Sequence, residues 1–172
     1  PLFEDASPQL GGHMHVENTF DDWGRQFLLP SGLSQLGPGV AWFDLDRDGY
    51  EDLIVGTGKG GRLAVFHNHK GRLVLDRGTR PAASADLTGV LGLASAAGVR
   101  VLAGVSTWEA RADSEMVRQS AVVGYDVARG IVSGKELPII ASHAAATGPI
   151  ALGDYNGDGL PDLFVGSRAV PL

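Results

Sequence analysis

Two nine-residue acidic segments, 44–52 and 154–162, limit what this chain can fold into more than any other feature. Each has oxygen-bearing side chains at its first, third, fifth and ninth positions, and a glycine at its sixth. Side chains at alternate positions can converge on one ion, and the glycine permits the sharp turn that brings the seventh carbonyl inward. This many oxygen ligands favours calcium over magnesium, which prefers fewer protein ligands and keeps its waters. The sequence therefore predicts two calcium loops.

The predicted ligands are similar in kind in both loops. The first loop offers the side chains of Asp44, Asp46, Asp48 and Asp52 with the carbonyl of Tyr50. The second offers the side chains of Asp154, Asn156, Asp158 and Asp162 with the carbonyl of Leu160. Since the first set has four carboxylates and the second has three, we expect the first loop to hold its ion more tightly. The weaker alternative is a pair of solvated acidic turns that bind nothing, because Asp and Gly are common turn residues.

The residues around both loops exclude an EF-hand, which needs two flanking helices and a bidentate Glu at position 12. Position 12 is a valine in each case, Val55 and Val165. The flanking segments are short, apolar and β-prone: 40–43 and 53–55 around the first loop, 150–153 and 163–165 around the second. Each unit is therefore predicted to be a strand, a calcium loop and a second strand.

An internal repeat predicts how these hairpins are organised. The two units lie far apart, and a degenerate middle copy between them has its two strands at 89–94 and 99–104 without an acidic loop. Four short antiparallel strands per repeat of roughly 50 residues are typical of a β-propeller blade. We therefore expect an all-β chain made of an N-terminal extension, a blade with a calcium loop, a degenerate blade, and an incomplete third blade with a calcium loop: residues 1–36, 37–85, 86–140 and 141–172.

These hairpins resemble FG-GAP repeats, also called VCBS repeats, known from the integrin alpha-chain propeller and from many secreted bacterial proteins. Segment 37–56 carries the fullest resemblance, and 61–68 resembles the third strand of such blades. The opening residues 3–7, together with the loop motifs, are similar to bacterial propellers of the cartilage-acidic-protein type. The resemblance implies a calcium-binding propeller, and it specifies the blade without specifying an activity.

Composition narrows the function classes. The 172 residues suffice for one domain with a real core, and the formal net charge of −6 without a Lys/Arg cluster argues against nucleic acid as a partner. The chain has no cysteine and no apolar run of the roughly 18 residues that would suggest a membrane span. No nucleophile-elbow or phosphate-loop motif occurs, so we expect no enzymatic activity.

The number of predicted blades is too small for a closed propeller. Propellers close with roughly four to eight blades, and an open arc of three would leave strand edges unpaired. We therefore expect the chain to be part of a larger propeller, or to assemble with a protein partner or with copies of itself. The residues 1–7 are a candidate for a donated closing strand. Millimolar calcium outside cells matches such loops, so the predicted location is secreted, extracellular or periplasmic.

Two other features leave alternatives open. His13 and His15 would share one face of an extended segment, with Glu17 next in line. Because no third ligand can be assigned, we favour a polar loop over a second kind of metal or ligand site. Trp23 and Trp108 are expected on solvated loops, Trp108 beside the charged run 109–118. They are the contact residues of the alternative function, a glycan-binding or enzyme-associated propeller. The preferred function is a non-catalytic, calcium-stabilised module for protein interaction or self-assembly.

Overall fold

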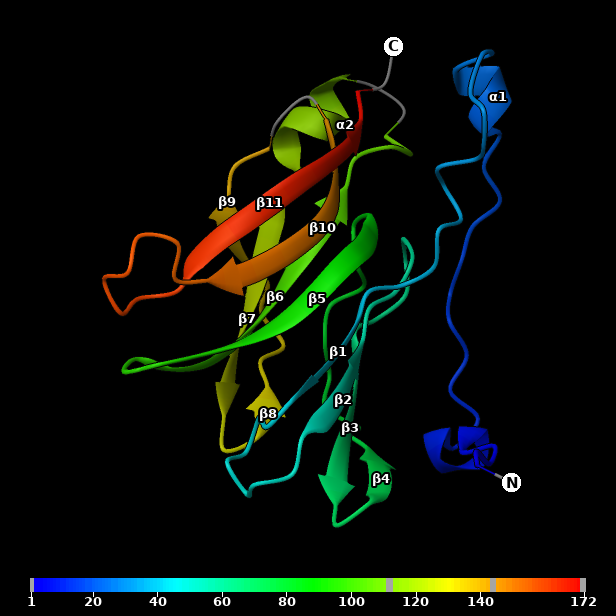
Figure 1. Cartoon of the computed structure of the whole chain (residues 1–172). Helices are drawn as coiled ribbons and strands as arrows, with labels where there is room; N and C mark the ends of the chain where they lie inside the picture. The colour runs from blue at the N-terminus through cyan, green and yellow to red at the C-terminus, as the bar shows by residue number, and fades with distance from the viewer. Residues whose placement is uncertain (1, 111–112, 143–144, 171–172) are drawn as a thin grey trace.

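The computed structural model describes residues 2–110, 113–142 and 145–170 and contains three antiparallel sheets (Figure 1). The first sheet consists of β1 (Val40–Phe43), β2 (Asp52–Val55), β3 (Ala64–His69) and β4 (Arg72–Leu75). The second consists of β5 (Asp86–Ser95), β6 (Gly98–Ser106), β7 (Val122–Ala128), β8 (Ile131–Val132) and β9 (Leu137–Ile140). The third is the hairpin of β10 (Ala146–Gly153) and β11 (Asp162–Ala169). The all-β fold of four-stranded antiparallel blades is confirmed.

The first two sheets place four strands in sequence order. The first has the order β1-β2-β3-β4, and the second has the order β5-β6-β7-β8. In the second sheet the outermost position is divided, because β8 and β9 both pair with β7. In the middle copy, which has no acidic loop, a tight turn at 96–97 joins β5 and β6.

The first strands of the three sheets, β1, β5 and β10, lie next to one another (Figure 1), and we call them the inner strands. Backbone hydrogen bonds join the first two sheets, because Gly39 N–H donates to the carbonyl of Leu87 at 3.0 Å and Leu87 N–H donates to that of Thr57 at 2.8 Å. The hydroxyl of Thr88 donates to the carbonyl of Thr147 at 3.0 Å and so reaches the third sheet. The sheets therefore meet along their inner strands, as propeller blades do.

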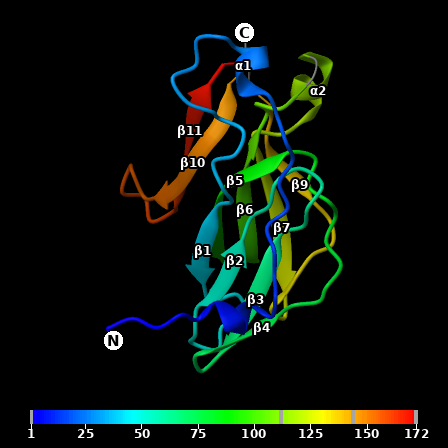
Figure 2. The same ribbon diagram turned by 90° about the vertical axis from the view of Figure 1, so that its right-hand side faces the viewer.

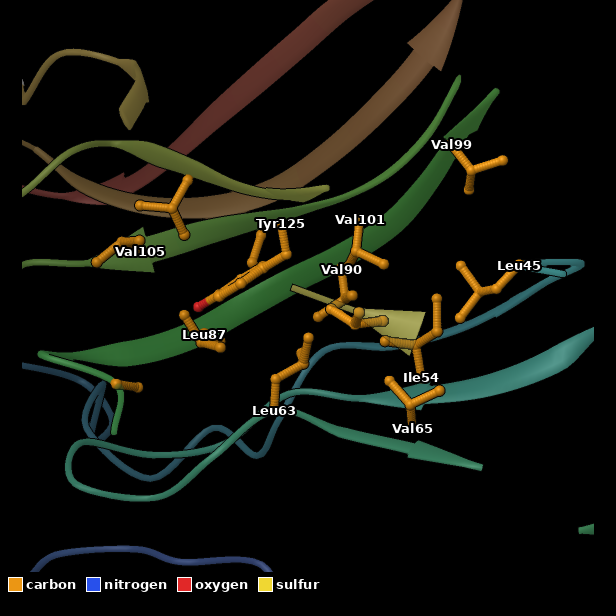
Figure 3. Close-up of a cluster of buried hydrophobic side chains, with 14 of the residues drawn as sticks. Leu45, Ile54, Leu63, Val65, Leu87, Val90, Val99, Val101, Val105 and Tyr125 are labelled. Carbon is orange, nitrogen blue, oxygen red and sulfur yellow. The ribbon is translucent and has the colours of Figure 1, made fainter. Parts of the chain in front are cut away.

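The core lies between the faces of the first two sheets (Figure 3). Strand pairing puts Ile54 opposite Val65 on the face that points to the second sheet, where both side chains are fully buried. Their partners across the interface include Val90, Val101 and Tyr125 of the second sheet. Leu45, although it belongs to the first acidic loop, turns inward and joins this cluster with 2 % of its surface exposed. Each large aliphatic side chain buried here contributes about 1.5–3 kcal/mol to stability.

The opposite face of the first sheet is covered by the N-terminal segment, residues 2–36 (Figure 2). The 3-10 helix η1 (Ser7–Leu10) brings Leu10 against the Leu53 and Phe66 side chains, which alternate with the core pair along the same strands. The segment then runs to the four-residue helix α1 (Asp22–Arg25) at the other end of the sheets. None of its described residues forms a strand, so within this chain it covers a sheet face and does not extend a sheet.

The prediction of a solvated loop around Trp108 is wrong. Only 1 % of the Trp108 surface is exposed, its indole N–H donates to Asp22 Oδ1 at 2.5 Å, and the Arg25 guanidinium lies 5.5 Å from its ring centre. The charged run that follows includes the helix α2 (Asp113–Arg118). The N-terminal segment supplies the groups that bury Trp108. Because these groups are about 85 positions away in the sequence, no pattern near Trp108 predicts its burial. Trp23 stays half exposed, as expected, but it lies in helix α1 and not in a loop.

Because inner strands approach this closely, we predict that Gly56→Ala destabilises the fold. A methyl group at Gly56 would lie 2.7 Å from the carbonyl oxygen of Leu87 and 3.2 Å from the amide nitrogen of Gly39, both of which are backbone atoms. Such overpacking costs about 1–3 kcal/mol in the free energy of unfolding, measured by urea denaturation. Gly153→Ala is the matched control, since no atom lies within 4 Å of its added carbon. Equal stabilities of the two variants would contradict the proposed packing.

Candidate functional site

The first acidic loop folds around its own carboxylates. Asp44 accepts hydrogen bonds from the backbone N–H of Asp48 at 3.1 Å and of Gly49 at 3.0 Å, one on each oxygen. Asp46 also accepts the N–H of Asp48, at 3.1 Å. Asp48 in turn accepts the N–H of Tyr50 at 2.8 Å. Side-chain acceptors therefore replace the missing strand partners of these amides, which is why Asp suits such turns.

The same folding brings three predicted ligands together. Asp44, Asp46 and Asp48 each offer one carboxylate oxygen, and these oxygens lie within 4.8 Å of one another. A carboxylate has about four acceptor positions, so the amide bonds leave lone pairs free for a cation. Gly49 adopts a φ of 91°, a left-handed conformation that favours glycine, and this is the role predicted for the sixth position. The donors and their spacing suit a hard divalent ion.

Asp52, the fourth predicted carboxylate, is placed differently. Its side chain is 1 % exposed, and its two oxygens accept the backbone N–H groups of Leu45 at 3.0 Å and Asn68 at 2.9 Å. It forms a separate close group with Asp46 and His67, whose Nδ1 lies 3.5 Å from Asp52 Oδ1. Asp52 thus links the start of the loop to β3 in the folded chain. Asp46 belongs to both groups and connects them.

The second loop repeats the hydrogen bonds of the first. Asp154 accepts the N–H groups of Asp158 at 3.1 Å and Gly159 at 2.9 Å on its two oxygens. Asn156 Oδ1 accepts the Asp158 N–H at 2.9 Å, and Asp158 accepts the Leu160 N–H at 2.8 Å. This last bond, with a further one from the Asn156 side chain, lowers the pKa of Asp158. Two segments of different sequence and different surroundings thus form the same turn.

The second loop differs from the first at its ninth position. Asp162 accepts the Tyr155 N–H at 2.9 Å, as Asp52 accepts that of Leu45, but Asp162 is exposed. The reason is topological: within the described residues β11 pairs only with β10, so no neighbouring strand supplies a counterpart of the Asn68 amide. In the described part of the chain, this loop also forms no close group of three acidic or histidine side chains, because Asn156 takes the place of Asp46.

The histidines of the N-terminal segment are separated by the fold. His13 packs edge-on against Phe66 with the ring centres 5.5 Å apart, and burial, helped by the charge of His15, lowers the pKa of His13. His15 Nε2 instead lies 3.1 Å from Glu17 Oε2. Sequence spacing alone placed all three on one face, whereas the structure pairs only His15 with Glu17.

Comparison with known protein families agrees with this geometry. Residues 150–170 match the family model described as FG-GAP repeat, and this match covers the second half of β10, the second acidic loop and β11. The resemblance to FG-GAP repeats is therefore confirmed, and the chain contains a β-propeller-type module. Such repeats are typical of non-catalytic, extracellular interaction modules and often bind calcium. Searches of curated proteins and of solved structures found no match.

Among the described residues, no helix has the length and apolar character that crossing a membrane requires.

The two ninth-position aspartates give a matched test of the roles described for them. Asp52→Ala leaves two backbone amides without their acceptor. We expect each unsatisfied amide to lower the free energy of unfolding by about 1–3 kcal/mol. Asp162→Ala removes one bond from an exposed side chain, whose amide partner can turn to water, so the change should stay within about 0.5 kcal/mol. Urea denaturation with a chelator present separates this effect from metal binding. A larger loss for Asp162→Ala would contradict these roles.

Proposed function

We propose that the chain is a non-catalytic, calcium-stabilised extracellular β-propeller module that acts through protein association. The observation that carries this proposal is the shared geometry of the two acidic loops: both use the same carboxylate positions to accept the same loop amides. The first loop also gathers three carboxylates within 4.8 Å. The loop amides account for one acceptor position on each of these oxygens, and the remaining lone pairs supply the ligands for the proposed ion.

Calcium would be held by oxygens that the loops already orient. In the first loop these are Asp44, Asp46 and Asp48, with Asp52 beside them and the Tyr50 carbonyl as predicted from the sequence. In the second they are Asp154, Asn156, Asp158 and Asp162 with the Leu160 carbonyl. The bound ion would neutralise the mutual repulsion of the carboxylates and hold the two strands of each hairpin together. Its role is structural, and it supplies no chemistry to a substrate.

An extracellular location follows from the affinity that such loops have. Sites of exposed carboxylates in extracellular modules bind calcium with dissociation constants of about 10⁻⁴–10⁻³ M, which suits the concentration outside cells. The carboxylates of the first loop, apart from Asp52, are half-buried or exposed, and those of the second loop are all exposed. Solvent screens exposed charges and keeps such sites from binding calcium very tightly.

The association surface is the hairpin β10–β11. Strand β11 has no partner on its outer side among the described residues, and an unpaired edge is a template for another strand. Large apolar side chains are exposed on and beside it: Tyr155, Leu160 and Phe164 at 96 %, 68 % and 64 %. An open pocket of about 590 Å³ lies among residues 151–156 and 162–164. Because the other sheets fill four strand positions, the occupant we propose is a protein partner that adds strands to this edge.

The glycan-binding alternative loses its main support. It assigned Trp23 and Trp108 as contact residues, and Trp108 is buried against Asp22 and Arg25. The indole N–H of Trp23 donates to the Leu29 carbonyl at 3.2 Å, within its own segment. A stacking platform for a sugar requires exposed aromatic faces near each other, and these two tryptophans do not provide one.

Calcium removal tests the first part of the proposal. With calcium at ten times the dissociation constant, each site adds roughly 1.4 kcal/mol, so a chelator should lower Tm by several degrees, measured by calorimetry. Asp48→Ala should abolish more of this calcium-dependent increase than Asp158→Ala, because the first loop has more carboxylates. The pair is closely matched, since each change removes one hydrogen bond of 2.8 Å from a loop amide, and Asp158→Ala removes one more bond, from the Asn156 side chain at 2.9 Å. A Tm that is the same with calcium and with chelator would refute the proposal.

Sedimentation velocity tests the second part, with copies of the chain as the first candidate partner. We expect the chain to associate with increasing concentration, and Phe164→Ser to weaken that association at least about tenfold by removing an exposed apolar side chain. Phe27→Ser is the control, because Phe27 is also exposed but lies in the N-terminal segment. Strictly monomeric wild-type protein across the micromolar range would exclude self-assembly. Association that Phe164→Ser leaves unchanged would exclude this hairpin.

A further inference from the structure

A further group of acidic side chains lies where the N-terminal segment meets the second sheet. Glu17 belongs to the N-terminal segment, Asp86 begins β5, and Glu109 follows β6, and we call these three residues the junction cluster. Each offers a carboxylate oxygen within 4.8 Å of the other two. The residues are 23 or more positions apart in the sequence, so only the tertiary fold brings them together.

One member of the junction cluster is buried with an oxygen that has no hydrogen-bond partner among the described residues. Glu109 is 8 % exposed, and its Oε1 has no hydrogen-bond partner within the described part of the chain. A buried carboxylate oxygen that accepts no hydrogen bond costs free energy, and native proteins usually provide it with a partner. The Glu109 carboxylate faces two other carboxylates, and a group that only accepts hydrogen bonds cannot be its partner. A cation bound between the three side chains can be that partner.

The surroundings hold the other two carboxylates in place. Asp86 Oδ1 accepts the backbone N–H of Lys59 at 2.8 Å, and Glu17 Oε1 accepts that of Asn18 at 3.1 Å. His15 Nε2 lies 3.1 Å from the other Glu17 oxygen and fixes its orientation. Gly58 leaves the space that these oxygens need, because an added carbon there would lie 3.0 Å from Glu17 Oε1 and 3.4 Å from Asp86 Oδ1.

Local charge is unbalanced at the junction cluster. Burial, together with the charges of Asp86 and Glu17, raises the pKa of Glu109 to about 7, and burial also raises the pKa of Asp86. Lys59 is a cationic side chain nearby, and its Nζ is hydrogen-bonded to Glu115 at 2.7 Å. The carboxylates therefore repel one another in a partly desolvated place, which a bound positive charge would relieve.

We propose that Glu17, Asp86 and Glu109 bind a divalent metal ion that fastens the N-terminal segment to the second sheet. Three carboxylates are the ligands that calcium and manganese prefer. An entry path exists, because an open cavity of about 640 Å³ is lined by Glu109, Lys59 and residues 18–20. The site is separate from the two acidic loops and does not depend on the function proposed for them.

Manganese is the probe, because its electron paramagnetic resonance signal distinguishes free from bound ion. The wild-type chain should bind one Mn²⁺ more than Glu109→Gln, which keeps the shape of the side chain and removes its charge. Glu4→Gln, an exposed residue of the same segment, is the control and should bind as many ions as wild type. In crystals soaked with Mn²⁺, anomalous density should lie between the three carboxylates.

Two further variants keep the test decisive if Glu109→Gln does not fold. Glu17→Gln and Asp86→Asn should each lose the same Mn²⁺, while Asp48→Ala should lose a different one. Hydrogen exchange should show that residues 13–20 are protected by Mn²⁺ in wild type and not in Glu17→Gln. If added Ca²⁺ displaces the bound Mn²⁺, the site is assigned to calcium. If the Mn²⁺ stays bound, the site is assigned to manganese, and either outcome supports the proposal. Unchanged Mn²⁺ binding in all three junction variants would overturn it.

Discussion

The close approach of the inner strands is the constraint on which the rest of the structure depends. Sheets normally pack about 10 Å apart through their side chains, but here the edges of two sheets are near enough for backbone hydrogen bonds between Gly39, Leu87 and Thr57. Glycine makes this distance accessible, since a methyl group at Gly56 or Gly92 would collide with backbone or with the Phe43 ring. With the inner strands fixed, the faces of the first two sheets enclose the valine, leucine and tyrosine side chains of the core.

The acidic loops show how the same local structure acquires different properties in different surroundings. Both loops turn because an aspartate accepts the amides of residues four and five positions later, and this requires nothing beyond the loop itself. In the first loop the third strand adds the Asn68 amide and buries Asp52, which makes that hairpin a fixed part of the core. In the second loop no described strand lies beside β11 on its outer side, and Asp162 stays in solvent. The two loops therefore differ in rigidity, a property that affects calcium affinity as much as charge does.

The N-terminal segment connects parts of the chain that the sheets alone leave separate. It covers Phe66 with Leu10 and His13, and it buries Trp108 through Asp22 and Arg25. Asp22 is held as a carboxylate: burial opposes this, but hydrogen bonds from Ser34, Leu33 and Trp108 prevail and lower its pKa. The segment also carries Glu17 to the junction cluster. These contacts cover the outer face of the first sheet, whereas among the described residues β11 has no strand partner other than β10.

The sequence by itself determined the acidic turns, the strands beside them and the repeat of the hairpin, because these depend on residues within about ten positions of one another. The apolar residues beside each loop predict the strands, and the positions of Asp44 and Gly49 predict the turn between them. Tertiary structure alone decided that Asp52 is buried while Asp162 is exposed, that Trp108 lies inside, and that Glu17 joins Asp86 and Glu109. In each case the deciding partner lies at least 16 residues away in the chain, on another strand or segment. Local patterns specify which turn forms, but the burial and charge of a side chain depend on what packs against it.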